Sequence, residues 1–132
     1  MSKKKILIVD DDPDLRLGLH VWLKAQGYDT FFAADGMAAM SSARKEQPDL
    51  IILDLGLPAG DGFTVLNRLH SSTYLAVVPV IVLSARDAAR NKPLALKAGA
   101  SAYFQKPPDQ AALLVTIRDL LGQTESAPAA PR

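Results

Sequence analysis

The chain has 132 residues, 48% of them hydrophobic and 22% charged, which is the size and composition of one globular domain. A formal net charge of +1 gives no electrostatic reason to expect binding to nucleic acid, and the apolar runs are far too short to span a bilayer. The absence of cysteine excludes disulfides, thiolate metal sites and a cysteine nucleophile, and fits a reducing, cytoplasmic location.

Five short apolar segments have the composition of buried strands. Their apolar residues are continuous rather than alternating with polar ones, which is typical of a parallel sheet that is covered on both faces. In chain order the predicted strands are residues 6–9 (ILIV), 30–33 (TFFA), 50–53 (LIIL), 79–84 (PVIVLS) and 102–104 (AYF).

An amphipathic helix is predicted after each strand, from apolar residues spaced three or four apart. Pro13 and Asp14 open the first helix and Gly27 ends it, while Asp35 is placed to cap the second. Pro93 is acceptable only in the first turn of the fourth helix. The predicted core faces consist of Leu15, Leu19, Trp22 and Leu23; Met37, Met40 and Ala43; Phe63, Leu66 and Leu69; Leu94, Ala95 and Ala98; and Leu113, Ile117, Leu120 and Leu121.

Five strands alternating with five helices predict an α/β domain, which we expect to comprise residues 1–122. His20 and His70 lie on predicted helices without a second ligand-type residue at metal-binding spacing, so we interpret both as surface residues. From Gln123 onward the sequence QTESAPAAPR has the composition of a flexible tail or linker. The basic N-terminus meets acidic residues after a short apolar run and lacks a cleavage site, so no signal peptide is expected.

Polar residues follow the predicted strands. The carboxyl ends of parallel strands lie at one edge of an α/β sheet, so these residues are expected to meet in one cleft. Several carboxylates suit a hard cation such as Mg²⁺, while a lysine and a serine hydroxyl could stabilise a transferring phosphoryl group. The residues are Asp10, Asp11, Asp12, Asp54, Ser84 and Lys106.

The motifs around these residues are ILIVDD (6–11), PDLIILDLGLPAGDG (48–62), PVIVLSA (79–85) and KAGASAYFQKP (97–107). They resemble the receiver domains of two-component response regulators, and the second motif contains the family's pattern as Asp54, Pro58, Asp61 and Gly62. The resemblance implies a flavodoxin-like (βα)5 fold, a doubly wound five-stranded parallel sheet with strand order 2-1-3-4-5. It also implies phosphorelay signalling, in which a sensor histidine kinase or a phosphotransfer protein donates the phosphoryl group.

The resemblance implies a role for each residue of the cleft. Asp54 would be the phosphoacceptor, Lys106 would pair with Asp54 and then with the phosphoryl group, and Ser84 would bond a phosphoryl oxygen. Asp10 would reach the metal mostly through water. The implied Mg²⁺ ligands are Asp10, Asp11, Asp54 and the main-chain carbonyl of Gly56.

The resemblance further implies a conformational switch. Ser84 and Tyr103 would form it, with the Tyr103 ring turning inward on activation. A downstream output domain or protein would bind the face of the fourth helix, fifth strand and fifth helix, where a phosphorylation-dependent homodimer could also form. No direct binding to nucleic acid or membrane is implied. The domain would not be an enzyme, beyond self-phosphorylation and autodephosphorylation.

Three finer expectations concern residues beside the cleft. Asp12 falls outside the metal-binding pair and is expected to be a charge at the N-terminus of the first helix. The bond between Lys106 and Pro107 is expected to be cis. Gly56 and Arg86 would flank the approach of water to the acyl phosphate, open on the glycine side and shielded by the arginine.

Three other classes compete. A phosphatase of the haloacid dehalogenase type also uses an aspartate, Mg²⁺, Ser or Thr and Lys, and Asp10-x-Asp12 fits its D-x-D motif, but the Asp54 motif would be unexplained. A flavodoxin-like electron carrier would need a Ser/Thr/Gly-rich phosphate loop where this chain has DDDPD. A phosphorylation-independent interaction module would not require an acidic cleft.

Overall fold

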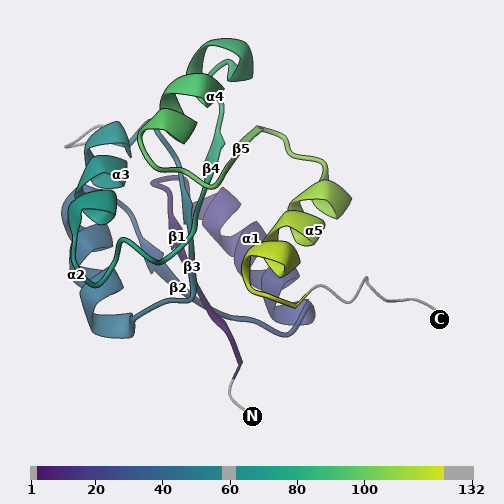
Figure 1. Ribbon diagram of the computed structural model, residues 1–132. Coiled ribbons are helices and arrows are strands. Elements are labelled where there is room, and N and C mark those ends of the chain that lie inside the picture. Colours follow the sequence, from purple (N-terminus) through teal and green to yellow (C-terminus); the bar gives the residue numbers. More distant parts are fainter. Residues whose placement is uncertain (1–2, 58–61, 124–132) are drawn as a thin grey trace.

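Five strands alternate with five helices in the computed structural model, which describes residues 3–57 and 62–123 (Figure 1). None of the helices in these two stretches is long and apolar enough to cross a membrane. The elements are β1 (Lys5–Val9), α1 (Pro13–Ala25), β2 (Asp29–Ala33), α2 (Gly36–Glu46), β3 (Leu50–Leu53), α3 (Gly62–Ser71), β4 (Val80–Ser84), α4 (Ala88–Lys97), β5 (Ala102–Gln105) and α5 (Gln110–Leu120).

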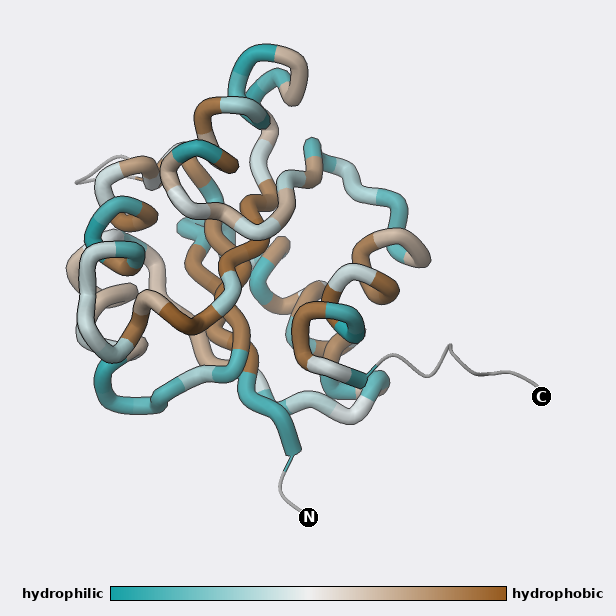
Figure 2. The backbone as a smooth tube through the Cα atoms, viewed as in Figure 1, coloured by the Kyte–Doolittle hydropathy of each residue, from teal (hydrophilic) through white to brown (hydrophobic). Residues whose placement is uncertain are grey.

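The strands form one parallel sheet in the order β2-β1-β3-β4-β5, which confirms the predicted fold and strand order. Helices α2, α3 and α4 cover one face of the sheet and α1 and α5 cover the other (Figure 1). Figure 2 colours the chain by the hydropathy of each residue, and the central strands, which lie between the two layers of helices, are among its most hydrophobic parts. The sheet is therefore doubly wound.

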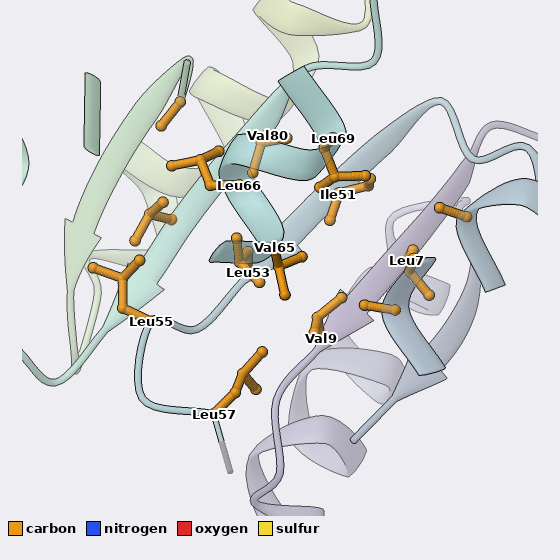
Figure 3. Close-up of a cluster of buried hydrophobic side chains, with 14 of the residues drawn as sticks. Leu7, Val9, Ile51, Leu53, Leu55, Leu57, Val65, Leu66, Leu69 and Val80 are labelled. Carbon is orange, nitrogen blue, oxygen red and sulfur yellow. The ribbon is translucent and has the colours of Figure 1, made fainter. Parts of the chain in front are cut away.

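Successive residues of each central strand enter opposite halves of the core, since side chains alternate across a strand. In β1, Ile6 and Ile8 pack with α1 and α5, whereas Leu7 and Val9 pack with α2 and α3. Figure 3 shows the second group, where strand side chains meet the inner face of α3. Fully burying one such side chain is worth about 1.5–3 kcal/mol, which explains why these strands are apolar at every position.

The predicted helix ends are confirmed. One Asp12 carboxylate oxygen accepts the backbone N–H groups of Asp14 (3.0 Å) and Leu15 (3.4 Å), so Asp12 is the N-cap of α1. Asp35 caps α2 in the same way, through the N–H of Ala38 at 2.8 Å. Gly27 follows α1 with a φ of +96°, the left-handed conformation expected at its C-terminal end.

Two predicted core residues are wrong. The buried line of α2 begins at Gly36 and continues through Ala39, Met40 and Ala43, so Met37 lies one position outside it and is 79% exposed. In α4 only Ala95 is fully inside, and its neighbour Leu94 is 52% exposed. Apart from Met40, the buried positions of both helices are small residues, and the larger Met37 and Leu94 point outward.

The expectation for Pro93 is also wrong, since this residue lies in the second turn of α4 rather than in the first. His20 is half-buried rather than a plain surface residue, because its ring bonds the Thr30 hydroxyl and meets Phe32 edge-on at 5.6 Å. His70 is exposed as expected, but its ring lies against Gly99, where an added Cβ would come within 2.7 Å of Nδ1.

Gln123, the first residue of the predicted tail, is bonded to the domain. Its side-chain oxygen accepts the hydroxyl of Tyr28 at 2.7 Å, and its N–H donates to the carbonyl of Arg118 at 2.7 Å. Residues 124–132 lie outside the described part of the chain, so the tail stays a prediction.

Candidate functional site

Of the residues predicted to converge at the carboxyl edge of the sheet, Asp10, Asp11, Asp54 and Lys106 come together there, whereas the side chain of Asp12 turns away. There the ladder of hydrogen bonds continues one residue beyond the strands, which fixes the backbone from which the site residues project. The bonds run from Asp10 N–H to Ala33 (3.0 Å), from Asp54 N–H to Val9 (2.9 Å) and from Lys106 N–H to Ser84 (2.8 Å), each to a main-chain carbonyl.

Three carboxylates meet at this edge. Oxygen atoms from Asp10, Asp11 and Asp54 all lie within 4.8 Å of one another. Asp10 and Asp54 are buried, at 3% and 8% exposure, whereas Asp11 is exposed. The strand order explains the meeting, because β1 and β3 are neighbours in the sheet although Asp10 and Asp54 are far apart in sequence.

Lys106 supplies the positive charge of the site. Its Nζ lies 2.9 Å from Oδ2 of Asp10 and 3.5 Å from Oδ2 of Asp54. The Lys106–Pro107 peptide bond is cis, which confirms the prediction. Lys106 therefore joins the end of β5 to the ends of β1 and β3.

Burial and pairing oppose each other in the protonation of this site. Burial raises the pKa of Asp10 above its ordinary value, and the bonds from Lys106 and from the N–H of Asp12 offset only part of that effect. For Lys106, burial alone would lower the pKa, but the hydrogen bond to Asp10 and the charges of Asp10 and Asp54 outweigh it and raise the pKa. The lysine is therefore held as a cation at neutral pH.

The acidic loop is stabilised by one contact within the loop and one from α1. The side chain of Asp12 turns away to cap the helix, while its N–H donates to Oδ1 of Asp10 at 2.9 Å. Arg16 donates from Nη1 to the main-chain oxygen of Asp10 at 3.1 Å, and its guanidinium lies 6.0 Å from the centre of the Phe32 ring. Arg16 was not among the site residues predicted from the sequence; its position one turn after Asp12, on the same side of the helix, was the available signal.

Ser84 and Tyr103 are linked through the backbone of Arg86. Ser84 is buried, and its Oγ accepts the N–H of Arg86 at 3.1 Å. The Tyr103 hydroxyl donates to the carbonyl of Arg86 at 2.7 Å, and its ring, 7% exposed, lies inward against the core. Burial raises the pKa of Tyr103, so its hydroxyl remains a donor.

Two glycines shape the chain around Asp54. The N–H of Gly56 donates to Oδ1 of Asp54 at 3.2 Å, and an added Cβ there would lie 3.9 Å from both carboxylate oxygens, in ordinary contact. At Gly62 an added Cβ would come within 2.4 Å of the Cα of Leu55 and 2.5 Å of the carbonyl of Asp54. Only glycine allows α3 to begin this close. Pro58 and Asp61 of the same motif lie outside the described residues.

The donors present fit a magnesium ion. Three carboxylates carry three negative charges and Lys106 carries one positive charge, so two negative charges are left for a divalent cation to neutralise. The charged groups that could bind the metal are carboxylates, and their hard oxygen atoms are the ligands that Mg²⁺ prefers. Because Asp11 is exposed, the site is also open to the waters that Mg²⁺ usually keeps.

Comparisons with known proteins agree with this site. The family model of the response regulator receiver domain matches residues 6–118. The chain is 40% identical over 128 residues to the DNA-binding dual master transcriptional regulator RpaA of Synechocystis sp., covering 97% of this chain and 53% of that protein. It is 35% identical to the DNA-binding response regulator MtrA of Mycolicibacterium smegmatis, covering 96% of this chain and 54% of MtrA. The chain thus spans about half the length of the curated relatives it matches.

Solved structures give the same result. The receiver domain of the sensor histidine kinase PA1611 from Pseudomonas aeruginosa PAO1, with a magnesium ion coordinated in its active-site cleft, superposes with a TM-score of 0.83 at 29% identity. That alignment covers 92% of this chain and 99% of the other. The BeF3-activated receiver domain of Klebsiella pneumoniae RstA gives 0.82 at 32% identity, over 89% and 98% of the two chains. The chain belongs to the receiver domains of two-component response regulators, signalling domains that histidine kinases phosphorylate.

Proposed function

We propose that Asp54 is the residue that accepts the phosphoryl group, and that Mg²⁺ is held by Asp10, Asp11, Asp54 and the main-chain carbonyl of Gly56. The observation that carries this proposal is the contact of Lys106 Nζ with both Asp10 and Asp54, beside an exposed third carboxylate. A carboxylate nucleophile and a phosphoryl group repel each other, and this site gathers the charges that cancel the repulsion.

The transfer needs positioning more than covalent assistance. A carboxylate oxygen of Asp54 attacks the phosphorus of a phosphohistidine, the P–N bond breaks, and its electron pair stays on the imidazole nitrogen. The product is a mixed anhydride of Asp54, which water hydrolyses. Lys106 offsets negative charge on the nucleophile and then on the phosphoryl oxygens. Bound Mg²⁺ would supply further charge neutralisation.

The response starts at Ser84. Its hydroxyl would donate to a phosphoryl oxygen on Asp54, and because its Oγ also accepts the N–H of Arg86, movement of Ser84 would be felt in the loop after β4. Tyr103 holds the carbonyl of the same residue, so the three groups would move together. Couplings of this kind amount to about 1–3 kcal/mol.

The partners follow from this mechanism. A sensor histidine kinase or phosphotransfer protein would donate the phosphoryl group, and an output domain or protein, or a second copy of the domain, would read the α4-β5-α5 face. RpaA and MtrA, of which this chain spans about half, are DNA-binding regulators, so DNA binding is the kind of output that we propose for the signal. Cytoplasmic location stays a prediction from the sequence.

Phosphorylation with a small donor tests the proposal. Labelled acetyl phosphate should transfer one phosphoryl group per chain with Mg²⁺ and almost none after chelation of the metal. Membership of the receiver family leaves the phosphatase and electron-carrier interpretations without support. Incubation with a generic phosphate ester checks the phosphatase interpretation, because a receiver domain should hydrolyse almost none of it. Steady turnover of that ester would contradict the receiver mechanism, and so would labelling that is independent of Mg²⁺.

A further inference from the structure

The loop between β4 and α4 is held at both ends by the end of β5. Ser84 and Gln105 are partners in the register of the two parallel strands, and the next residue, Lys106, donates its N–H to the Ser84 carbonyl at 2.8 Å. At the other end of the loop, the N–H of Ala88 donates to Oε1 of Gln105 at 2.9 Å. A short segment, residues 85–87, lies between these two attachments.

The bond to Gln105 completes the N-terminus of α4. The first N–H groups of a helix have no partner within the helix. Asp87, the N-cap, accepts the N–H of Arg90 at 3.1 Å, which leaves Ala88, the first residue of α4, to another acceptor. That acceptor comes from β5, and it belongs to the residue directly before Lys106. Few side chains at this exposed position could provide it, because it requires an acceptor of this length.

We infer that Gln105 is a positioning residue for the phosphorylation response. It anchors the first turn of α4 to β5 in the arrangement in which Tyr103 is inward and bonded to Arg86. This inference rests on the roles proposed above for Ser84 and Tyr103.

Gln105 would affect the response because it determines which residues move when Ser84 shifts. With Ser84 held by the strand ladder and Ala88 held by Gln105, a shift of the Ser84 hydroxyl is absorbed by the three residues between them, whose central member is the partner of Tyr103. Without the Gln105 acceptor, the first turn of α4 frays, and the arrangement that unites Ser84, Arg86 and Tyr103 becomes less populated. Phosphorylation that depends on this arrangement then slows.

Three variants test the inference. Gln105→Leu keeps the approximate size of the side chain and removes the acceptor, whereas Gln105→Glu keeps an acceptor oxygen. Asp109→Ala is the matched control, because it removes the acceptor for Ala112 N–H at the N-terminus of α5 and leaves the loop after β4 untouched. Amide hydrogen exchange at Ala88 reports the bond itself, and the rate of phosphorylation by acetyl phosphate with Mg²⁺ reports the response.

Gln105→Leu should lose protection at Ala88 and accept phosphoryl groups about two- to tenfold more slowly, the range expected for one hydrogen bond. Its affinity for Mg²⁺ should not change, since Gln105 contacts none of the carboxylates in the part of the chain described. Gln105→Glu and Asp109→Ala should react like the wild type. If Gln105→Leu misfolds, Gln105→Ala takes its place.

Two results would overturn the inference: wild-type phosphorylation in Gln105→Leu despite lost protection at Ala88, or equal slowing in Asp109→Ala. The first would make Gln105 a simple helix cap, and the second would make the effect one of general stability. If the wild-type chain accepts no phosphoryl group at all, the proposed function is overturned. That result differs from a failure of the Gln105 inference, because the wild type and every variant would then all remain unphosphorylated.

Discussion

The Nζ atom of Lys106 lies 2.9 Å from Oδ2 of Asp10, although two strands, β3 and β4, separate β5 from β1 in the sheet. The lysine therefore reaches across the carboxyl edge and passes close enough to Asp54, at 3.5 Å, to pair with it as well. A cation that contacts a carboxylate of the proposed metal site and the proposed nucleophile together is placed to follow the charge as it moves from carboxylate to phosphoryl oxygens.

The two exposed aspartates of the acidic loop should have separable roles. Asp11→Asn removes a charged oxygen from the carboxylate cluster, so Mg²⁺ affinity should fall by about tenfold or more. Asp12→Ala removes the N-cap of α1, so the free energy of unfolding should fall by about 1 kcal/mol with little change in Mg²⁺ affinity. Metal titration and denaturant unfolding of both variants measure the two effects. An equal loss of affinity in Asp12→Ala would show that the acidic pair has been placed one residue off.

Gly62 should be irreplaceable by alanine. The added methyl group would overlap the backbone of Asp54 and Leu55, at 2.4–2.5 Å, so Gly62→Ala should lower the free energy of unfolding by about 1–3 kcal/mol and slow phosphorylation. Gly18 in α1 is the control: nothing lies within 4 Å of its added Cβ, and Gly18→Ala should raise stability by about 0.5–1 kcal/mol. Urea unfolding compares them. A Gly62→Ala variant as stable as Gly18→Ala would contradict the close approach of α3.

The lifetime of the acyl phosphate should depend on Arg86. Its backbone is held by the Ser84 hydroxyl and by the Tyr103 hydroxyl, so its long cationic side chain starts beside the site. We expect this side chain to shield the phosphoryl group, so that Arg86→Ala shortens the lifetime several-fold; Arg90→Ala, an exposed cation further along α4, is the control. Release of labelled phosphate in Mg²⁺ buffer measures the lifetime. An unchanged or longer lifetime would leave the open side at Gly56 as the controlling feature.

Stability should fall in alkaline solution. Burial raises the pKa of Tyr28 above its ordinary value of 10.0, and the nearby Arg118 offsets only part of that effect. A raised pKa in the folded state means that the contribution of Tyr28 is complete below pH 10 and is lost as the pH rises through the folded value. In that window Tyr28→Phe should flatten the decline of unfolding free energy with pH by at most about 1.4 kcal/mol per pH unit. Tyr74→Phe, at an 85% exposed position, serves as control, and an equal effect there would refute the assignment.

The sequence predicted most of the fold because its signals were local and redundant. The strand at residues 50–53 was placed without error, and Asp12, Gly27 and Asp35 mark helix ends through chemistry that depends on few neighbours. Met37 and Leu94 failed for the opposite reason. In α2 the buried side is set partly by small residues, and a pattern of large apolar residues does not register Gly36 or Ala39. In α4 the predicted face correctly included Ala95, but its larger neighbour Leu94 points outward.

The site was predicted by topology together with family resemblance. Carboxyl ends of parallel strands share an edge, which is why Asp10, Asp54 and Lys106 were expected to meet. Arg16 and Gln105 were missed because each acts on main-chain groups, Arg16 on the carbonyl of Asp10 and Gln105 on the N–H of Ala88. Such contacts depend on the exact backbone path and carry no motif.

Localisation of the phosphoryl group by mass spectrometry tests the central claim most directly. Wild-type protein and the Asp54→Asn variant would be incubated with acetyl phosphate and Mg²⁺, weighed intact, and then digested to find the modified residue. The structure predicts one phosphoryl group on the wild-type chain, carried by Asp54, and none on the variant. A phosphoryl group on Asp10 or Asp11, or undiminished labelling of Asp54→Asn, would contradict the assignment of Asp54 as the acceptor.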